Sequence, residues 1–583
     1  MPAKEKMAGA QTTGRRRGIV WENVTSIEGN STQVKCNYCD ESISNRKLRI
    51  ESHMGKCKRK REIQNDTLQP DDVTLQPDDE NPSSSSSSAA LAPAVDKRRR
   101  MDSFVTKTSN AKKDELDLQV ARFYYANNIS FNTSENEEWI KLCHMLRPGY
   151  KPPSRHEVGG PLLDKVFEDV NKESKEELKS ASKITICQDG WSSVSHDPIL
   201  AHSYHTGTAT HLHSVVDCGA NKKDAPYCFE KLKEAIAEIK EQTGKEVIGC
   251  VTDNENKMLN MRELLAEENP KILTWGCQAH YLNLLEHDLE LLDITEEIQK
   301  VQKHFRNCHR SHGLLKEKGG KMPVISNDTR WNSKIASVES FIENHPIYTE
   351  IIDEMSDWPH AELSANFDAV SEIVSDNSFM RNASKLLKNL KKFSAALDKM
   401  QADSTTLADA IYVWIHLFGD EKLSDFQEEI GNRFTQAYEP FFFLAFYTDH
   451  RYVDEVIEGD DDHQRQAEKW LSEYNPDFLQ SYVKYQLKDR DLYPEYMFSS
   501  KMQEMPARKW WSFIKQKAEK RNDQQEMKFA EFMVDLHSCP SSSASLERFF
   551  STFGFVWSKT RNRLGHQKAF KLVKIYRHLR SST

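Results

Sequence analysis

The chain has 583 residues and a formal net charge of −9, a length that exceeds a single hydrophobic core and predicts several domains. Residues 1–62 carry 14 Lys and Arg against 7 Asp and Glu, so a basic segment precedes an acidic body, as is typical of a part that binds nucleic acid. No phosphate-binding loop, HExxH motif or GxSxG motif is present, which leaves ATP use and metalloprotease chemistry without support.

Eleven cysteines are few for this length and indicate a reducing, intracellular compartment. The N-terminus lacks the apolar stretch of a signal peptide, and no apolar run reaches the ~18 residues that a membrane helix needs. We therefore expect a soluble protein without a membrane partner. Basic runs at 56–61 and 97–100 suit nuclear import, so we expect the nucleus, although such runs equally suit solvated or phosphate-binding charge.

Four candidate metal ligands lie in the basic segment. Cys36, Cys39, His53 and Cys57 have the spacing C-x2-C-x13-H-x3-C, which suits a tetrahedral zinc ion better than it suits four unrelated residues. So short a segment has too little core to fold without its metal. The sequence therefore predicts a structural zinc site in a segment that contacts double-stranded DNA.

This segment, residues 15–62, resembles a BED-type zinc finger. The resemblance includes Trp21 ahead of the first cysteine, whereas Val24 stands near the place of a second expected aromatic residue. Residues 63–103 then contain "TLQPDD" twice and a serine run, a composition that predicts a disordered linker. Apolar residues at helical spacing follow, and they predict a helical domain over 104–180.

The period then changes to that of strands. The segments "SKITICQDGWSS", "ILAHSYHTGTAT" and "HLHSVVDCGA" predict three strands, "YCFEKLKEAIAEIKEQTGK" predicts a helix, and "VIGCVT" predicts a fourth strand. Asp189 is expected at the end of the first strand, and Asp253 follows the fourth. Either residue alone suits a solvated turn. If the first and fourth strands are neighbours, the two carboxylates meet, and a divalent cation would remove their repulsion.

Paired acids at such strand ends are typical of RNase H-like nucleotidyl transferases, in which two metal ions assist phosphoryl transfer. Such a site needs a third acid from a later helix. The candidate is Glu547 in "SASLERFFSTFG", although a glutamate in the first turn of a helix is also favoured by the helix dipole alone.

Several motifs together resemble the hAT-superfamily transposases: "DGWS" (189–192), "VTDNENKM" (251–258), "CQAH" (277–280), "TRWNS" (329–333), "SASLERFFSTFG" (543–554) and "RPGYKPPSR" (147–155). The resemblance implies that Asp189, Asp253 and Glu547 are catalytic acids that hold magnesium or manganese. It also implies an RNase H-like core, residues 181–260 and 536–583, interrupted by an all-helical insertion over 261–535. The fold class is thus multidomain α/β and α.

The resemblance further implies cut-and-paste transposition, with strand cleavage and strand transfer on transposon-end and target DNA and no small-molecule substrate. Trp331, preceded by Arg330, would stack on an extruded base. The helical domain and the C-terminal segment would form a homodimer or a higher homo-oligomer. Residues 559–580 contain eight Lys and Arg and no acid, which suits DNA phosphates as well as an apolar interface.

Two alternatives stay open. Cys277 and His280, with His304 and Cys308, have a spacing that a second zinc site can use, although local packing suits the first pair better. The chain can also be a domesticated, transposase-derived regulator that binds DNA through its zinc finger and regulates transcription without catalysis.

Overall fold

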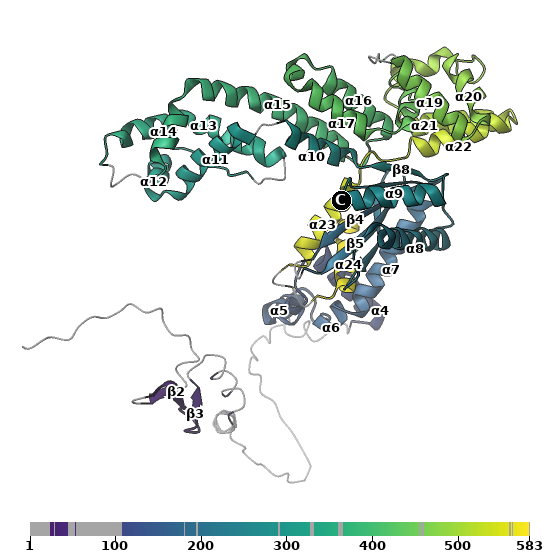
Figure 1. Cartoon of the computed structure of the whole chain (residues 1–583). Coiled ribbons are helices and arrows are strands. Elements are labelled where there is room, and N and C mark those ends of the chain that lie inside the picture. Colours follow the sequence, from purple (N-terminus) through teal and green to yellow (C-terminus); the bar gives the residue numbers. More distant parts are fainter. Residues whose placement is uncertain are drawn as a thin grey trace, which may run out of the picture. The chain divides into compact units, whose positions relative to one another are not determined.

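The computed structural model describes residues 24–27, 30–44, 50, 53, 57, 108–179, 181–193, 196–289, 292–326, 331–359, 365–453, 455, 460–558, 561 and 564–581. The chain forms two compact units, Met1–Lys97 and Arg98–Thr583, and the described part is mostly helical with two small sheets (Figure 1). The predicted linker at 63–103 lies outside these residues. No helix in the described part is long and apolar enough to span a bilayer.

The first unit contains a three-stranded antiparallel sheet of β1 (Val24–Ile27), β2 (Asn30–Cys36) and β3 (Ser42–Ser44). Val34 pairs with Ile43, and both side chains are buried with those of Cys36, Ile50 and Cys57. This core is too small to offset the conformational entropy of folding alone. The cysteines in it therefore point to a metal as the missing stabilising element.

The second unit begins with helices, followed by strands and two further helices. The helices are α4 (Asn110–Ala126), the 3-10 helix η3 (Phe131–Glu135), α5 (Glu137–Leu146), α6 (Arg155–Val158) and α7 (Pro161–Leu178). The strands and the helices between them are β4 (Ile184–Ser192), β5 (Pro198–His205), β6 (Thr210–Asp217), α8 (Ala225–Thr243), β7 (Val247–Thr252), α9 (Asn256–Glu268) and β8 (Leu273–Gly276). The predicted order of three strands, a helix and a strand is confirmed.

The five strands form one mixed sheet in the order β6-β5-β4-β7-β8. β4, β5 and β6 are antiparallel neighbours, whereas β4, β7 and β8 run parallel. β4 and β7 are therefore neighbours, as the argument for a shared acidic site required. The predicted all-helical segment 261–535 is wrong in one respect, because it contains β8. That strand has four residues, too few for an alternating pattern to reveal it.

Alternate residues of β4 face two different layers. Ile184 and Ile186 pack with α8 and α9, whereas Cys187 packs with the opposite layer. Successive side chains of a strand point to opposite faces, so Asp189 lies on the same face as Cys187. Only helices that cover the Cys187 face of the sheet can therefore approach the side chain of Asp189.

Thirteen α-helices and three 3-10 helices in the described residues separate β8 from the last two helices of the chain. They are α10 (Gln278–Asp288), α11 (Leu292–Asn307), α12 (His309–Glu317), α13 (Trp331–Ser356), α14 (Phe367–Ser375), α15 (Asn377–Gln401), α16 (Leu407–Phe418), η5 (Glu421–Phe426), α17 (Gln427–Ala437), α18 (Pro440–Tyr447), α19 (Asp460–Tyr474), α20 (Asp477–Gln486), η6 (Glu495–Phe498), η7 (Ser500–Met502), α21 (Ala507–Lys520) and α22 (Gln524–Leu536).

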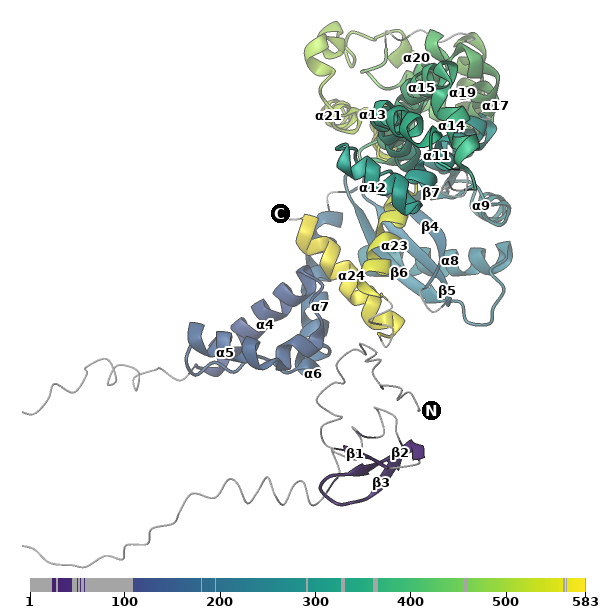
Figure 2. The ribbon, with the colours of Figure 1, turned by 90° about the vertical axis from the view of Figure 1, so that its left-hand side faces the viewer.

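The chain then returns to the sheet. α23 (Ala544–Val556) packs against β4, β5 and β6, and α24 (His566–Ser581) packs against β6, α4 and α7 (Figure 2). The apolar stripe of α23, which includes Leu546, Phe549 and Phe553, is buried. The sheet is thus covered by a helix that follows the long helical segment.

We expect Gly249→Ala to destabilise the second unit by about 1–3 kcal/mol, as is usual when a packed core is overfilled. A Cβ atom at Gly249 in β7 would lie 2.4 Å from the ring of Trp275, which is buried and has little room to move. Thermal unfolding followed by circular dichroism measures the effect. Gly313→Ala is the control, because a Cβ atom at Gly313, in α12, meets nothing within 4 Å. Equal unfolding temperatures for the two variants would contradict the argument.

Candidate functional site

Four metal-ligating side chains meet in the first unit. The ligand atoms of Cys36, Cys39, His53 and Cys57 all lie within 4.8 Å of one another. Cys36 ends β2, and the Cys39 Sγ atom lies 3.2 Å from the Nε2 atom of His53. Three thiolates and one imidazole are typical donors of structural zinc sites. The structure therefore brings the predicted set together, and this cluster can bind zinc.

The turn after β2 is fixed by its own backbone. The Cys36 N–H donates to the Glu41 carbonyl, and the Asp40 N–H donates to the Cys36 carbonyl, both at 3.0 Å. The Glu41 carboxylate also lies 3.5 Å from the Nδ1 atom of His53. A carboxylate on this nitrogen orients the ring and leaves the Nε2 atom for the metal. The spacing of the ligands gave no sign of this role of Glu41.

Asp189 lies within β4, and not at its end as the sequence predicted, because the strand continues beyond it alongside β5. Its side chain is buried, and one carboxylate oxygen accepts a hydrogen bond from the Gly190 N–H at 2.6 Å. Burial raises the pKa of Asp189 well above its ordinary value, and the charges of Asp253 and Glu547 raise it further. The three predicted acids therefore interact electrostatically.

Asp253 follows β7 directly and is half-buried. One of its carboxylate oxygens accepts from the Glu255 N–H at 3.2 Å, and burial raises the pKa of this acid. The guanidinium of Arg262, on α9, donates to the Asp253 carbonyl at 2.8 Å and to the Thr252 hydroxyl at 2.6 Å. Arg262 thus positions the backbone at Asp253. Sequence analysis missed it because an arginine that turns inward looks the same in a helical pattern as one on the surface.

Glu547 lies in the first turn of α23 and is exposed. The helix dipole favours a carboxylate there, which is the simpler explanation that the sequence left open. Its charge nevertheless reaches Asp189 and also the buried Cys277. Burial, followed by the charge of Glu547, raises the pKa of the Cys277 thiol to about 11. Glu547 therefore belongs to the same cluster of charges.

Aromatic contacts dock α23 against β4. Trp191 stacks on Phe550, with ring centroids 5.9 Å apart and an interplanar angle of 10°, and it contacts Phe553 at 5.7 Å. Trp191 lies two residues after Asp189, so the two side chains share one face of the sheet. Phe550 lies three residues after Glu547, so these two share one side of the helix. The stacking therefore brings Glu547 to the face that carries Asp189.

The donor set of the three carboxylates fits a hard divalent cation such as magnesium or manganese, which prefers oxygen ligands. In the protein alone their repulsion is offset in part by Lys257, whose charge lowers the pKa of Asp189 and of Asp253. Lys257 itself lies 2.5 Å from the Glu255 carboxylate. Among the described residues, the Cys3His cluster is the one group of three or more His, Cys, Asp or Glu side chains already gathered as metal ligands, and the three acids do not form such a group.

The alternative of a second zinc site is wrong. The two ring nitrogens of His304 are engaged by Asn366 at 3.2 Å and by Ser311 at 2.8 Å. Cys277 precedes α10 and is buried, and His280 lies close enough to the second acid for its charge to lower the pKa of that acid. Cys277 and His280 therefore border the acidic site and do not join the other pair.

Two further predictions have different outcomes. Arg330 lies outside the described residues, and so does the side chain of Trp331, with which α13 begins; their contact with DNA stays a prediction. The cationic segment 559–580 contains most of α24, whose Leu572 and Ile575 are buried within this chain. Part of the apolar surface that was predicted for an interface thus packs internally.

The fold and the sites define a protein in which a Cys3His cluster that can bind a metal ion precedes an α/β unit with three electrostatically coupled acids. Residues 153–305, which include Asp189 and Asp253, match the domain of unknown function DUF659. Residues 489–579, which include Glu547, match the hAT family C-terminal dimerisation region. No curated protein matches the chain.

The two matches support the assignment of the chain to the hAT-family transposases. The Cys3His cluster is compatible with the BED-type finger that the sequence resembles. The C-terminal match also supports homo-oligomerisation. These findings agree with the class of protein that the sequence motifs indicated.

Removal of zinc should unfold the first unit, because metal binding and folding are one event in so small a domain. We expect purified protein to hold one zinc ion per chain and Cys57→Ser to hold far less. Metal analysis and circular dichroism before and after chelation measure both effects. Cys143→Ser, outside the cluster, is the control. Full zinc content in Cys57→Ser would exclude the proposed ligand set.

Asp189→Asn should stabilise the metal-free protein at neutral pH, because its carboxylate is buried among like charges. Since the pKa is raised in the folded state, the charge penalty is absent below about 3.9, the ordinary pKa of an aspartate, and grows as the pH rises above it. Each pKa unit corresponds to about 1.4 kcal/mol. Thermal melts over a pH series measure the gain. The exposed Asp398→Asn is the control, and a gain independent of pH would refute the electrostatic argument.

Proposed function

We propose that the protein is a cut-and-paste DNA transposase of the hAT type, with Asp189, Asp253 and Glu547 as its catalytic acids. The observation that carries the proposal is the electrostatic coupling of these acids, which come from three distant segments and raise the pKa of Asp189 together with burial. Acidic groups with strongly shifted pKa values gather at functional sites. Both family matches cover acids of this set.

The topology supports an RNase H-like core. The sheet order β6-β5-β4-β7-β8, with three antiparallel strands on one side and parallel strands on the other, is the arrangement expected of that fold. α23 returns to the same sheet after the long helical segment. The proposal is therefore an RNase H-like core interrupted by a helical insertion.

When bound, two magnesium or manganese ions would activate the attacking oxygen and stabilise the leaving one. The chain's own residues prepare the site for them. The Gly190 N–H orients one oxygen of Asp189, and Arg262 holds the backbone that carries Asp253. Because burial and the charges of Asp253 and Glu547 raise the pKa of Asp189, and burial raises that of Asp253, metal binding would release protons and weaken as the pH falls.

The remaining parts of the proposal concern DNA. The zinc finger would bind the DNA at the transposon ends, since its segment carries the surplus of positive charge. Arg330 and Trp331 would contact an extruded base. A homodimer or higher homo-oligomer would hold the transposon ends and the target, and the protein would act in the nucleus.

Glu547→Gln should abolish cleavage and leave DNA binding intact. The substrate is DNA that carries the flanks of the coding locus, incubated with purified protein and magnesium or manganese. We expect nicks or hairpins at defined ends, with the rate lowered about 100-fold or more in the variant, as is usual when one transition-state contact is lost. The exposed Glu519→Gln, on α21, is the matched control.

The same experiment separates the transposase from a domesticated regulator. A regulator would bind DNA in a zinc-dependent manner, and neither the unaltered protein nor Glu547→Gln would cleave it. Cleavage that persists in Glu547→Gln would instead remove this glutamate from the catalytic set.

A further inference from the structure

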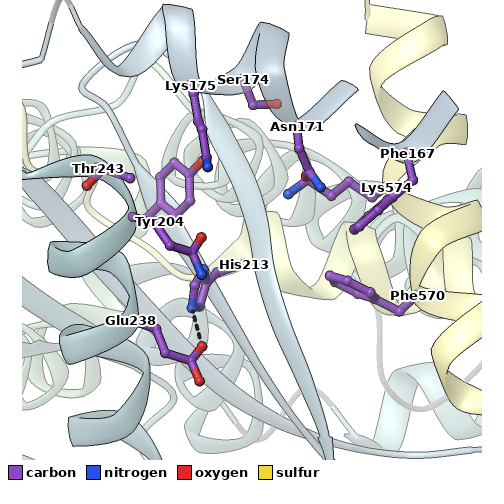
Figure 3. Close-up of a pocket in the computed structure, with 11 residues that line it drawn as sticks. Phe167, Asn171, Ser174, Lys175, Tyr204, His213, Glu238, Thr243, Phe570 and Lys574 are labelled. Carbon is purple, nitrogen blue, oxygen red and sulfur yellow. Dashed lines mark hydrogen bonds and ion pairs between the residues drawn. The ribbon is translucent and has the colours of Figure 1, made fainter. Parts of the chain in front are cut away.

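A cavity of about 220 Å³ lies among α7, α8, α24 and the strands β5 and β6 (Figure 3). Its lining combines aromatic rings, amides, hydroxyls and two lysines: Phe167, Asn171, Ser174, Lys175, Tyr204, His213, Glu238, Gln242, Thr243, Phe570 and Lys574. None of the three acids lines it. Tyr204 pairs with Ile186, three residues before Asp189 in β4, so the cavity lies toward the other end of the sheet.

Lys574 is the distinctive group of this cavity. No carboxylate among the described residues forms an ion pair with it, and its Nζ atom lies over the ring of Phe167, 5.7 Å from the ring centroid. Burial, followed by the charge of Lys175, lowers the pKa of Lys574 to about 8. One turn earlier on the same helix, Lys571 donates to Asp164 at 2.6 Å. The two lysines thus differ in whether the chain supplies a counter-charge.

Glu238, the acidic residue that lines the cavity, does not neutralise the charge of Lys574. Glu238 accepts a hydrogen bond from His213 at 3.2 Å, as Figure 3 shows, and no ion pair joins it to Lys574 in the described residues. Lys574 is half-buried, and an ammonium group that is partly withdrawn from water without a counter-charge lowers stability. An anion in the cavity would remove that cost, and the amide of Asn171 and the hydroxyl of Ser174 are further possible donors.

We propose that this cavity binds a small phosphate-bearing ligand, with the phosphate held between Lys574 and Lys175. The cavity has room for a phosphate and a small organic group but not for a DNA duplex, and Phe167, Phe570 and Tyr204 offer rings for that organic group. Two cations beside neutral donors are the usual means of holding a phosphate. The proposal does not rest on transposase activity, because none of its residues belongs to the acidic site.

Binding of inorganic phosphate to the full-length protein tests the proposal, by calorimetry and by thermal shift at constant ionic strength against chloride. We expect saturable binding by the unaltered protein. Lys574→Met, which keeps the volume and removes the charge, should weaken binding by roughly 10- to 100-fold, the value of a charge-assisted hydrogen bond. The exposed Lys568→Met on the same helix should bind as the unaltered protein does.

Folding of the variant is checked independently. Lys574→Met without ligand should unfold at the same or a higher temperature, because it removes a desolvated charge. If it fails to fold, Lys175→Gln takes its place and should weaken binding by several-fold. The absence of phosphate binding in the unaltered protein, or an equal loss in Lys568→Met, would overturn the proposal.

A competition experiment distinguishes a small phosphate-bearing ligand from the phosphates of a DNA backbone. A nucleoside monophosphate that displaces inorganic phosphate supports a small ligand. Displacement by a short DNA duplex, but not by the mononucleotide, would overturn the small-ligand assignment and place a backbone phosphate near Lys574. Either result is independent of DNA cleavage, so failure here and failure of the proposed catalytic activity are distinguishable.

Discussion

The stacking of Trp191 on α23 is the contact on which the acidic site depends. Glu547 is exposed and belongs to a helix that no strand precedes directly, so the position of that helix over the sheet depends on its packing. The rings of Phe550 and Phe553 supply that packing. Each such aromatic pair contributes about 0.5–1.5 kcal/mol beyond the area that it buries. The geometry of three acids thus rests on apolar packing beside them.

The helical segment between β8 and α23 is held at both of its ends by one residue. The Gln278 N–H donates to the Ser541 carbonyl at 3.1 Å, which joins the point where the chain leaves the sheet to the point where it returns. The Gln278 side chain also accepts from the indole of Trp414 at 2.9 Å and donates to the Ala437 carbonyl at 2.6 Å. Because the cost of closing a loop grows slowly with its length, so large an insertion is compatible with an intact sheet.

The features of the fold and the site that could be predicted from the sequence are those that periodicity and residue spacing determine. The order of the strands along the chain, the Cys3His cluster and the place of Asp253 depend on patterns within short windows. Three things escaped such windows: that β4 continues past Asp189, that β8 pairs with β7, and that Arg262 turns inward. Each is decided by contact with another segment of the fold, namely β5, β7 and the loop after β7, and not by the residue pattern of the segment itself. The cavity around Lys574 was invisible for the same reason, since five separate elements line it.

The late position of α23 also sets an order in time. Asp189 and Asp253 leave the ribosome long before Glu547, and at about 5–20 residues per second the intervening 290 or so residues take roughly 15–60 s. During that interval the sheet carries two acids and lacks the helix that covers their face. A nascent or truncated chain therefore exposes an apolar sheet surface without a complete set of acids. Chemistry at this site, if it needs all three acids, begins only after α23 has been synthesised.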